Sequence, residues 1–125
     1  MRWAYQPDGS KVFDNNNVVT GTAVLQDDEL DRVSFAGGFT QVDGESDFLV
    51  YQTKNTLTMR NFDTRRGKGP AIFETNDNFE NVKKAPDSLV EKCCGSYTLQ
   101  TGKVYVFRCY DGQHYAKMEV LEIID

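Results

Sequence analysis

The stretch KVYVFRCYDGQHYAKMEVLEI, Lys103 to Ile123, decides the fold of this chain. Two runs of alternating side chains flank Asp111-Gly112, a strong signal for a two-residue β-hairpin turn. The predicted pairs on one face are Cys109 with His114, Phe107 with Ala116, Tyr105 with Met118 and Lys103 with Val120. Those on the other face are Arg108 with Tyr115, Val106 with Lys117 and Val104 with Glu119. We expect the first, apolar face to join the core and the second, mixed face to meet water.

The rest of the chain repeats this pattern of short strands and turns. Turn residues such as Pro7-Asp8-Gly9-Ser10 and Gly37-Gly38 separate the runs. The segment Asp47–Thr53 contains FLVY, apolar on both faces, which predicts a central strand covered on both sides. The strands predicted before the hairpin are residues 18–25, 32–36, 39–42, 47–53, 56–62, 71–75 and 97–99, and residues 11–13 are a candidate for one more.

One segment changes period. Pro86 suits the first turn of a helix, Leu89, Val90 and Cys93 follow at helical spacing, and Gly95 suits its end. The sequence therefore predicts a single all-β domain over residues 1–125, with one short helix near residues 86–94. The architecture is a mainly antiparallel sandwich or small barrel of about eight or nine strands. The predicted core contains Phe35, Val50, Leu89, Tyr105, Phe107, Met118 and Val120.

Composition narrows the classes of function. The net charge of −5 argues against a nucleic-acid partner, which calls for a basic face. No apolar run approaches the roughly 20 residues of a membrane-spanning helix. The first residues, MRWAYQPDGSK, lack the apolar region of a signal peptide. We therefore expect a cytoplasmic protein as the chain is given, or an extracytoplasmic one if a leader was removed.

The three cysteines are Cys93, Cys94 and Cys109. An odd count favours free thiols over a disulfide framework, although one bridge with one free thiol stays open. Cys109 opposite His114 is the sharpest candidate for chemistry, because an imidazole can take the thiol proton and leave a nucleophilic thiolate. The same face is apolar, which equally predicts a buried, inert thiol. A thiol-dependent enzyme is therefore the alternative hypothesis, and we assign no catalytic residue.

The sequence predicts no metal and no cofactor. Adjacent Cys93 and Cys94 with Cys109 and His114 do not have the ligand spacing of a structural zinc site. The acidic segments 27–31 and 43–47 lack the 12-residue calcium loop with its closing Glu. The loop Gly67-Lys68-Gly69 lacks the glycine spacing of a phosphate-binding P-loop.

The favoured function is a small non-enzymatic binding or interaction module. Its predicted ligand site is the one basic patch of an acidic chain, suited to a small anionic ligand: Arg60, Arg65, Arg66 and Lys68. The competing version is a protein partner on Arg108 and Tyr115, since Arg and Tyr are enriched at interfaces. A homo-oligomer remains open.

The hairpin VYVFRCYDGQHYAKMEVLEI is similar in style to the last two strands of small β-rich lipoproteins of the HmuY haem-binding type. Haem capture in that family uses a pair of histidines, whereas this chain has only His114. No residue role is carried over from this resemblance.

Overall fold

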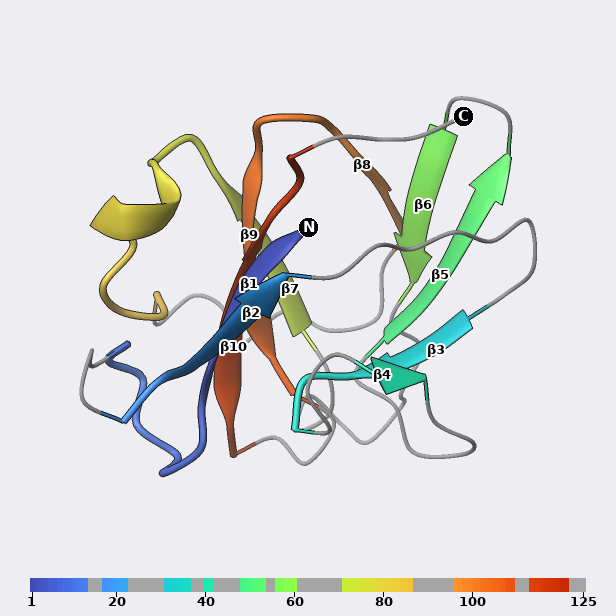
Figure 1. Cartoon of the computed structure of the whole chain (residues 1–125). Coiled ribbons are helices and arrows are strands. Elements are labelled where there is room, and N and C mark those ends of the chain that lie inside the picture. The colour runs from blue at the N-terminus through green and yellow to red at the C-terminus, as the bar shows by residue number, and fades with distance from the viewer. Residues whose placement is uncertain are drawn as a thin grey trace.

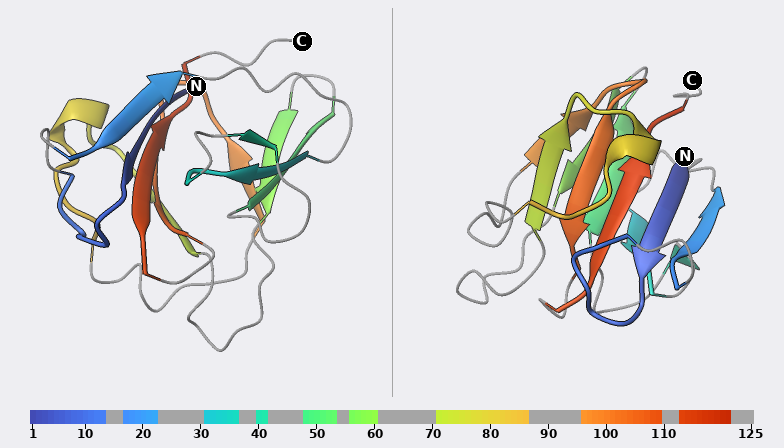
Figure 2. Two further views of the ribbon diagram at one scale, coloured as in Figure 1. Left: turned by 60° about the horizontal axis from the view of Figure 1, so that its bottom comes forward. Right: turned by 90° about the vertical axis from the view of Figure 1, so that its left-hand side faces the viewer.

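Two antiparallel sheets of five strands each make up the described part of the chain (Figures 1 and 2). The computed structural model describes residues 1–13, 17–22, 31–36, 40–41, 48–53, 56–60, 71–86, 96–109 and 113–121. The first sheet has the order β2-β1-β10-β9-β7 and contains β1 (Arg2–Gln6), β2 (Val19–Thr22), β7 (Ala71–Thr75), β9 (Val104–Arg108) and β10 (Tyr115–Glu119). The second has the order β4-β3-β5-β6-β8 and contains β3 (Asp31–Ser34), β4 (Thr40–Gln41), β5 (Phe48–Thr53), β6 (Thr56–Arg60) and β8 (Ser96–Leu99).

The predicted all-β fold is confirmed, with ten strands among the described residues. The pairing of β9 with β10 follows the predicted register from Arg108–Tyr115 to Val104–Glu119. The backbone N–H of Cys109 also donates to the carbonyl of His114 at 2.8 Å, as that register requires. Strand β5 is central in its sheet, as the FLVY run predicts. Strand β1 was not predicted.

The inner faces of the two sheets meet in one apolar core. The Phe107 ring of β9 lies 5.1 Å from the ring of Phe35 and 5.4 Å from that of Phe48, centroid to centroid. Five of the seven predicted core residues belong to this cluster: Phe35, Tyr105, Phe107, Met118 and Val120. The side chain of Val50 and all of Leu89 lie outside the described part.

The outer face of the first sheet is covered as well, by residues 76–86, which we call the strap. The strap contains a 3₁₀ turn, η1 (Phe79–Asn81). It is tied to the segment before β2 by two backbone bonds, from Phe13 N–H to the Lys83 carbonyl at 2.9 Å and from Ala85 N–H to the Lys11 carbonyl at 2.8 Å. Together these segments build a second apolar cluster on Ala4, Val104, Val106 and Tyr115: Phe13, Phe79, Val82 and Ala85.

The structure corrects one expectation. The Arg108–Tyr115 face of the hairpin does not meet water, because Arg108 is 2% exposed and Tyr115 is 7% exposed. Burial also lowers the pKa of the Arg108 guanidinium, by removing water from the charged form.

The helix predicted near residues 86–94 falls on residues 87–94, which lie outside the described part, and Pro86 itself is in neither a helix nor a strand. Within the described ranges, no helix has the length and apolar character needed to cross a membrane.

Candidate functional site

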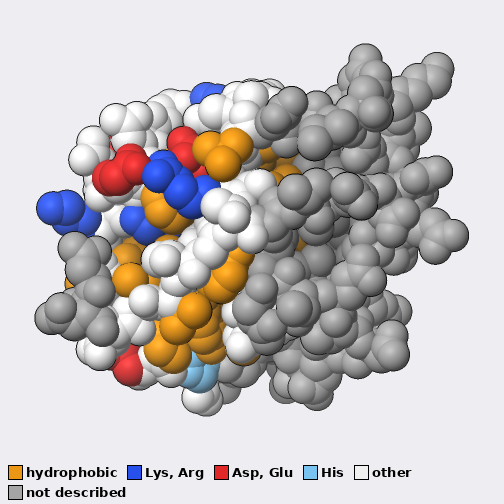
Figure 3. Space-filling view, in the orientation of Figure 1, with side chains coloured by type: hydrophobic (Ala, Val, Ile, Leu, Met, Phe, Trp, Pro, Cys, Tyr) orange, Lys and Arg blue, Asp and Glu red, His pale blue; other side chains and the backbone are white. Residues whose placement is uncertain are grey.

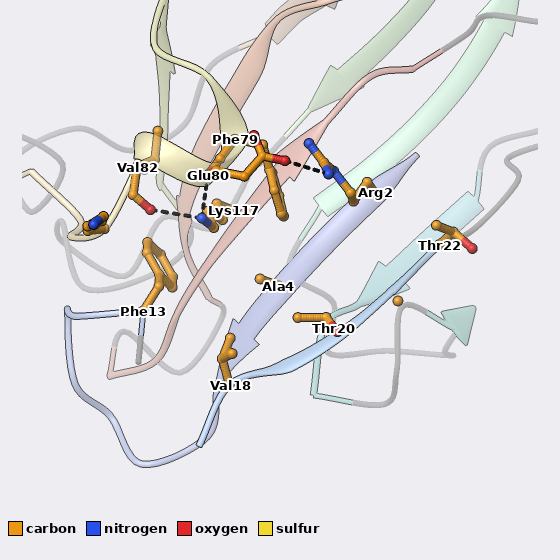
Figure 4. Close-up of a pocket in the computed structure, with 12 residues that line it drawn as sticks. Arg2, Ala4, Phe13, Val18, Thr20, Thr22, Phe79, Glu80, Val82 and Lys117 are labelled. Atoms are coloured by element: carbon orange, nitrogen blue, oxygen red, sulfur yellow. Dashed lines mark hydrogen bonds and ion pairs between the residues drawn. The ribbon is translucent and has the colours of Figure 1, made fainter. Parts of the chain in front are cut away.

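A groove of about 670 Å³ opens on the outer face of the first sheet, between β2 and the strap (Figure 4). The pairing registers explain why it forms there. Thr20 of β2 faces Ala4 of β1, and Ala4 faces Lys117 of β10, so the three lie in one row across the sheet. The strap covers β9 and β10, whereas Ala4 and Thr20 have short side chains that leave space above β1 and β2. The lining residues are Arg2, Ala4, Phe13, Val18, Thr20, Gly21, Thr22, Phe79, Glu80, Val82, Lys83 and Lys117.

Lys117 lies at the strap side of the groove and is only 7% exposed. Its Nζ donates hydrogen bonds to the carbonyl oxygens of Phe79 and of Val82, the second at 2.9 Å. The same Nζ lies 4.3 Å from the centre of the Phe79 ring and 5.5 Å from that of Phe13. These contacts stabilise a buried ammonium, since a cation is attracted to carbonyl oxygens and to aromatic faces. Burial lowers the Lys117 pKa, while the charge of Glu80 acts in the opposite direction.

Arg2 lies at the other end of the groove and is more accessible. Its Nη1 is 2.7 Å from Oε1 of Glu80 on the strap, and its Nη2 is 2.6 Å from Oε1 of Glu119 on β10. Its guanidinium also lies 4.2 Å from the centre of the Phe79 ring. Figure 4 shows Arg2 and Glu80 pointing toward one another across the mouth of the groove.

The groove combines apolar walls with excess positive charge. Its lining includes three basic residues, Arg2, Lys83 and Lys117, against one acidic residue, Glu80, whereas the whole chain has 14 basic and 19 acidic residues. In the space-filling view, basic and acidic side chains gather over the first sheet beside hydrophobic atoms (Figure 3). Such a concave, mainly apolar site with a few placed polar groups is typical of small-ligand pockets, and its volume is within their usual range.

The sequence predicted a different set of residues. Arg65, Arg66 and Lys68 lie outside the described part, and so does the side chain of Arg60, so the predicted basic patch stays a prediction. The predicted interface on Arg108 and Tyr115 also stays a prediction, and the burial of both side chains leaves little of them for a partner to contact.

Cys109 and His114 lie opposite one another, as predicted, but neither lines the groove. The Cys109 side chain is buried in the core between the sheets. The His114 ring stacks on Tyr5, with 5.8 Å between ring centroids. Cys93 and Cys94 lie outside the described part, and the described residues contain no cluster of three or more His, Cys, Asp or Glu side chains that could hold a metal ion.

No comparison with known proteins assigns a role to this groove, so its chemistry is the guide to what it binds. The chain matches no family model, no curated protein and no solved structure.

Proposed function

We propose that this protein is a non-enzymatic binding module that takes a small anionic ligand with an apolar body in the groove between β2 and the strap. The observation that carries the proposal is the composition of that groove. Phe13, Val18, Phe79 and Val82 supply apolar walls, while Arg2, Lys83 and Lys117 supply positive charge to an otherwise acidic chain.

The arrangement supports binding more than catalysis. The Lys117 ammonium is held by two carbonyl oxygens and two aromatic rings, and the Arg2 guanidinium by two carboxylates. Of these two cations, the Arg2 guanidinium is the one open to an anion, because its side chain is partly exposed, while the buried Lys117 ammonium adds positive charge to the wall of the groove. The alternative, a thiol enzyme using Cys109 and His114, would have to act at a thiol buried in the core.

The test uses 1-anilinonaphthalene-8-sulfonate, a fluorescent aromatic anion, as a probe of the folded protein. We expect saturable binding with one site per chain and a raised melting temperature, since a ligand that binds only the folded state stabilises it. Thr20→Trp should abolish this binding, because Thr20 is an exposed residue that lines the groove.

The matched control is Thr98→Trp, at an exposed position of β8 in the second sheet. It should bind the probe as the unchanged protein does. Absence of saturable binding, or equal loss in the two variants, would overturn the proposal.

A further inference from the structure

Among the three basic residues that line the groove, Lys117 and Arg2 are not equally available to a ligand. The Lys117 ammonium is buried, and its contacts with Phe79 and Val82 hold the strap on the sheet. Turning it toward a ligand would leave two carbonyl oxygens without their donor, which costs free energy for buried groups. The Arg2 side chain is 35% exposed, so it can contact a ligand while Lys117 keeps the strap on the sheet.

The two carboxylates that hold Arg2 also differ. Glu119 faces Arg2 across the β1–β10 pair, and its side chain is 19% exposed. Glu80 reaches Arg2 from the strap, and its side chain is 65% exposed. An ion pair as exposed as that between Arg2 and Glu80 contributes little to stability, because water and salt screen it. An incoming anion can therefore replace Glu80 at little cost, whereas Glu119 stays in place within the sheet.

We propose that the groove selects apolar monocarboxylates, whose head group replaces Glu80 on Nη1 of Arg2. This inference rests on the proposed function and names the ligand class of the same site. The body of the ligand would lie along the groove over Ala4, beside Thr20 and Phe79.

The chemistry around Arg2 supports a single negative charge. A guanidinium has five N–H donors in a planar fork that matches a carboxylate. In the described part of the chain Nη1 and Nη2 contact one carboxylate each, and Nε is buried without a hydrogen-bond partner, so the ligand would contact the Nη atoms. Glu80 itself shows that a carboxylate fits against Nη1. A dianion such as a phosphate monoester would be repelled by Glu119, which remains bound to the same guanidinium.

The test compares 2-naphthoate with 2-naphthamide, two probes of nearly the same shape of which only the first is charged. Affinities are measured by isothermal titration calorimetry on the folded chain. We expect naphthoate to bind about tenfold more tightly, as one charge-assisted contact of roughly 1.4 kcal/mol would give. Arg2→Met should reduce the affinity for naphthoate to that for naphthamide.

Glu80→Gln tests whether Glu80 competes with the ligand for Arg2, in addition to the effect of removing one negative charge near the groove. It removes the internal competitor, so naphthoate should bind severalfold more tightly while naphthamide is unchanged. The control is Asp77→Asn, which removes an equal charge from an exposed strap residue that makes no ion pair with a described residue. Asp77→Asn should change the affinity for naphthoate clearly less than Glu80→Gln does.

Equal binding of the two probes, or equal effects of Glu80→Gln and Asp77→Asn, would overturn the carboxylate inference. If anilinonaphthalene sulfonate still binds and Thr20→Trp still blocks it, the proposed function survives that result. If no probe binds in the groove, both proposals fail together.

Discussion

The indole of Trp3 lies directly against the backbone of Gly21. A Cβ atom on Gly21 would lie 2.7 Å from Cζ2 of Trp3 and 2.9 Å from Cε2, closer than side-chain atoms approach one another. The two residues face each other in the β1–β2 pair. The absence of a side chain at Gly21 therefore lets β2 lie beside β1 and form one wall of the groove, as a glycine inside a strand often permits a close approach.

Gly21→Ala should consequently destabilise the protein, by about 1–3 kcal/mol, the usual cost of adding a methyl group to a packed site. Urea denaturation followed by circular dichroism measures the change. The same substitution in a Trp3→Leu background should cost much less, because the clashing ring is gone. If Gly21→Ala lowers the unfolding free energy equally in both backgrounds, contact with the Trp3 indole is not the cause of the destabilisation.

Phe107→Ala should cost about 3–5 kcal/mol, as buried aromatic truncations do. The Phe107 ring contacts Phe35 and Phe48 of the opposite sheet, so its loss leaves a cavity between the sheets. Val12→Ala, at a side chain that is 48% exposed, is the control and should change stability by about 0.5 kcal/mol or less. An unchanged denaturation midpoint for Phe107→Ala would contradict the packing of the two sheets.

Lys117→Met should alter how stability depends on pH. Burial lowers the Lys117 pKa in the folded state from its ordinary 10.5, against the weaker opposing effect of Glu80. Between the lowered pKa and 10.5 the unfolded chain binds more protons than the folded one, so stability rises with pH there. The unchanged protein should thus gain stability relative to Lys117→Met as the pH rises through that window.

The measurement is the difference in unfolding free energy between the two proteins at a series of alkaline pH values. Titration of Tyr105, whose pKa is raised mainly by burial, affects both proteins alike and cancels in that difference. A difference that stays constant with pH would contradict the predicted shift at Lys117.

Cys109 should react slowly with a thiol reagent while the protein is folded, since its side chain is only 4% exposed. A Cys93→Ser/Cys94→Ser variant isolates the reaction of this one thiol. Unfolding in urea should increase the rate by orders of magnitude. Rapid labelling of the folded variant at about pH 6, far below an ordinary thiol pKa, would instead revive the thiol-enzyme hypothesis.

The final hairpin was predictable because its information is local. A two-residue turn predicted at Asp111-Gly112 and the period-2 alternation together define a register, and the observed β9–β10 pairs match it. On its second face, the burial of Val104, Val106 and Lys117 depends on the strap, which is polar apart from a few residues such as Phe79 and Val82. Val104 and Val106 were the available signal for that burial, since both are apolar and both lie on the face that was expected to meet water.

The groove could not be predicted from local sequence patterns. Arg2 and Glu119 lie 117 positions apart in sequence and come together only through the pairing of β1 with β10. Within β1 itself, RWAYQ mixes polar and apolar side chains without a clear strand signal. A single sequence gives no information on which distant strands become neighbours.

The position of β1 between β2 and β10 has a consequence for the order in which the protein assembles during synthesis. Strand β2 emerges from the ribosome soon after β1 and can pair with one of its edges. The other edge must wait until β10 has emerged, more than a hundred residues later. Contacts between such distant segments are slow to form, typically milliseconds to seconds for β proteins of this kind. Until then the nascent chain presents an unpaired strand edge with Trp3 and Tyr5 on one side, the kind of surface that molecular chaperones bind.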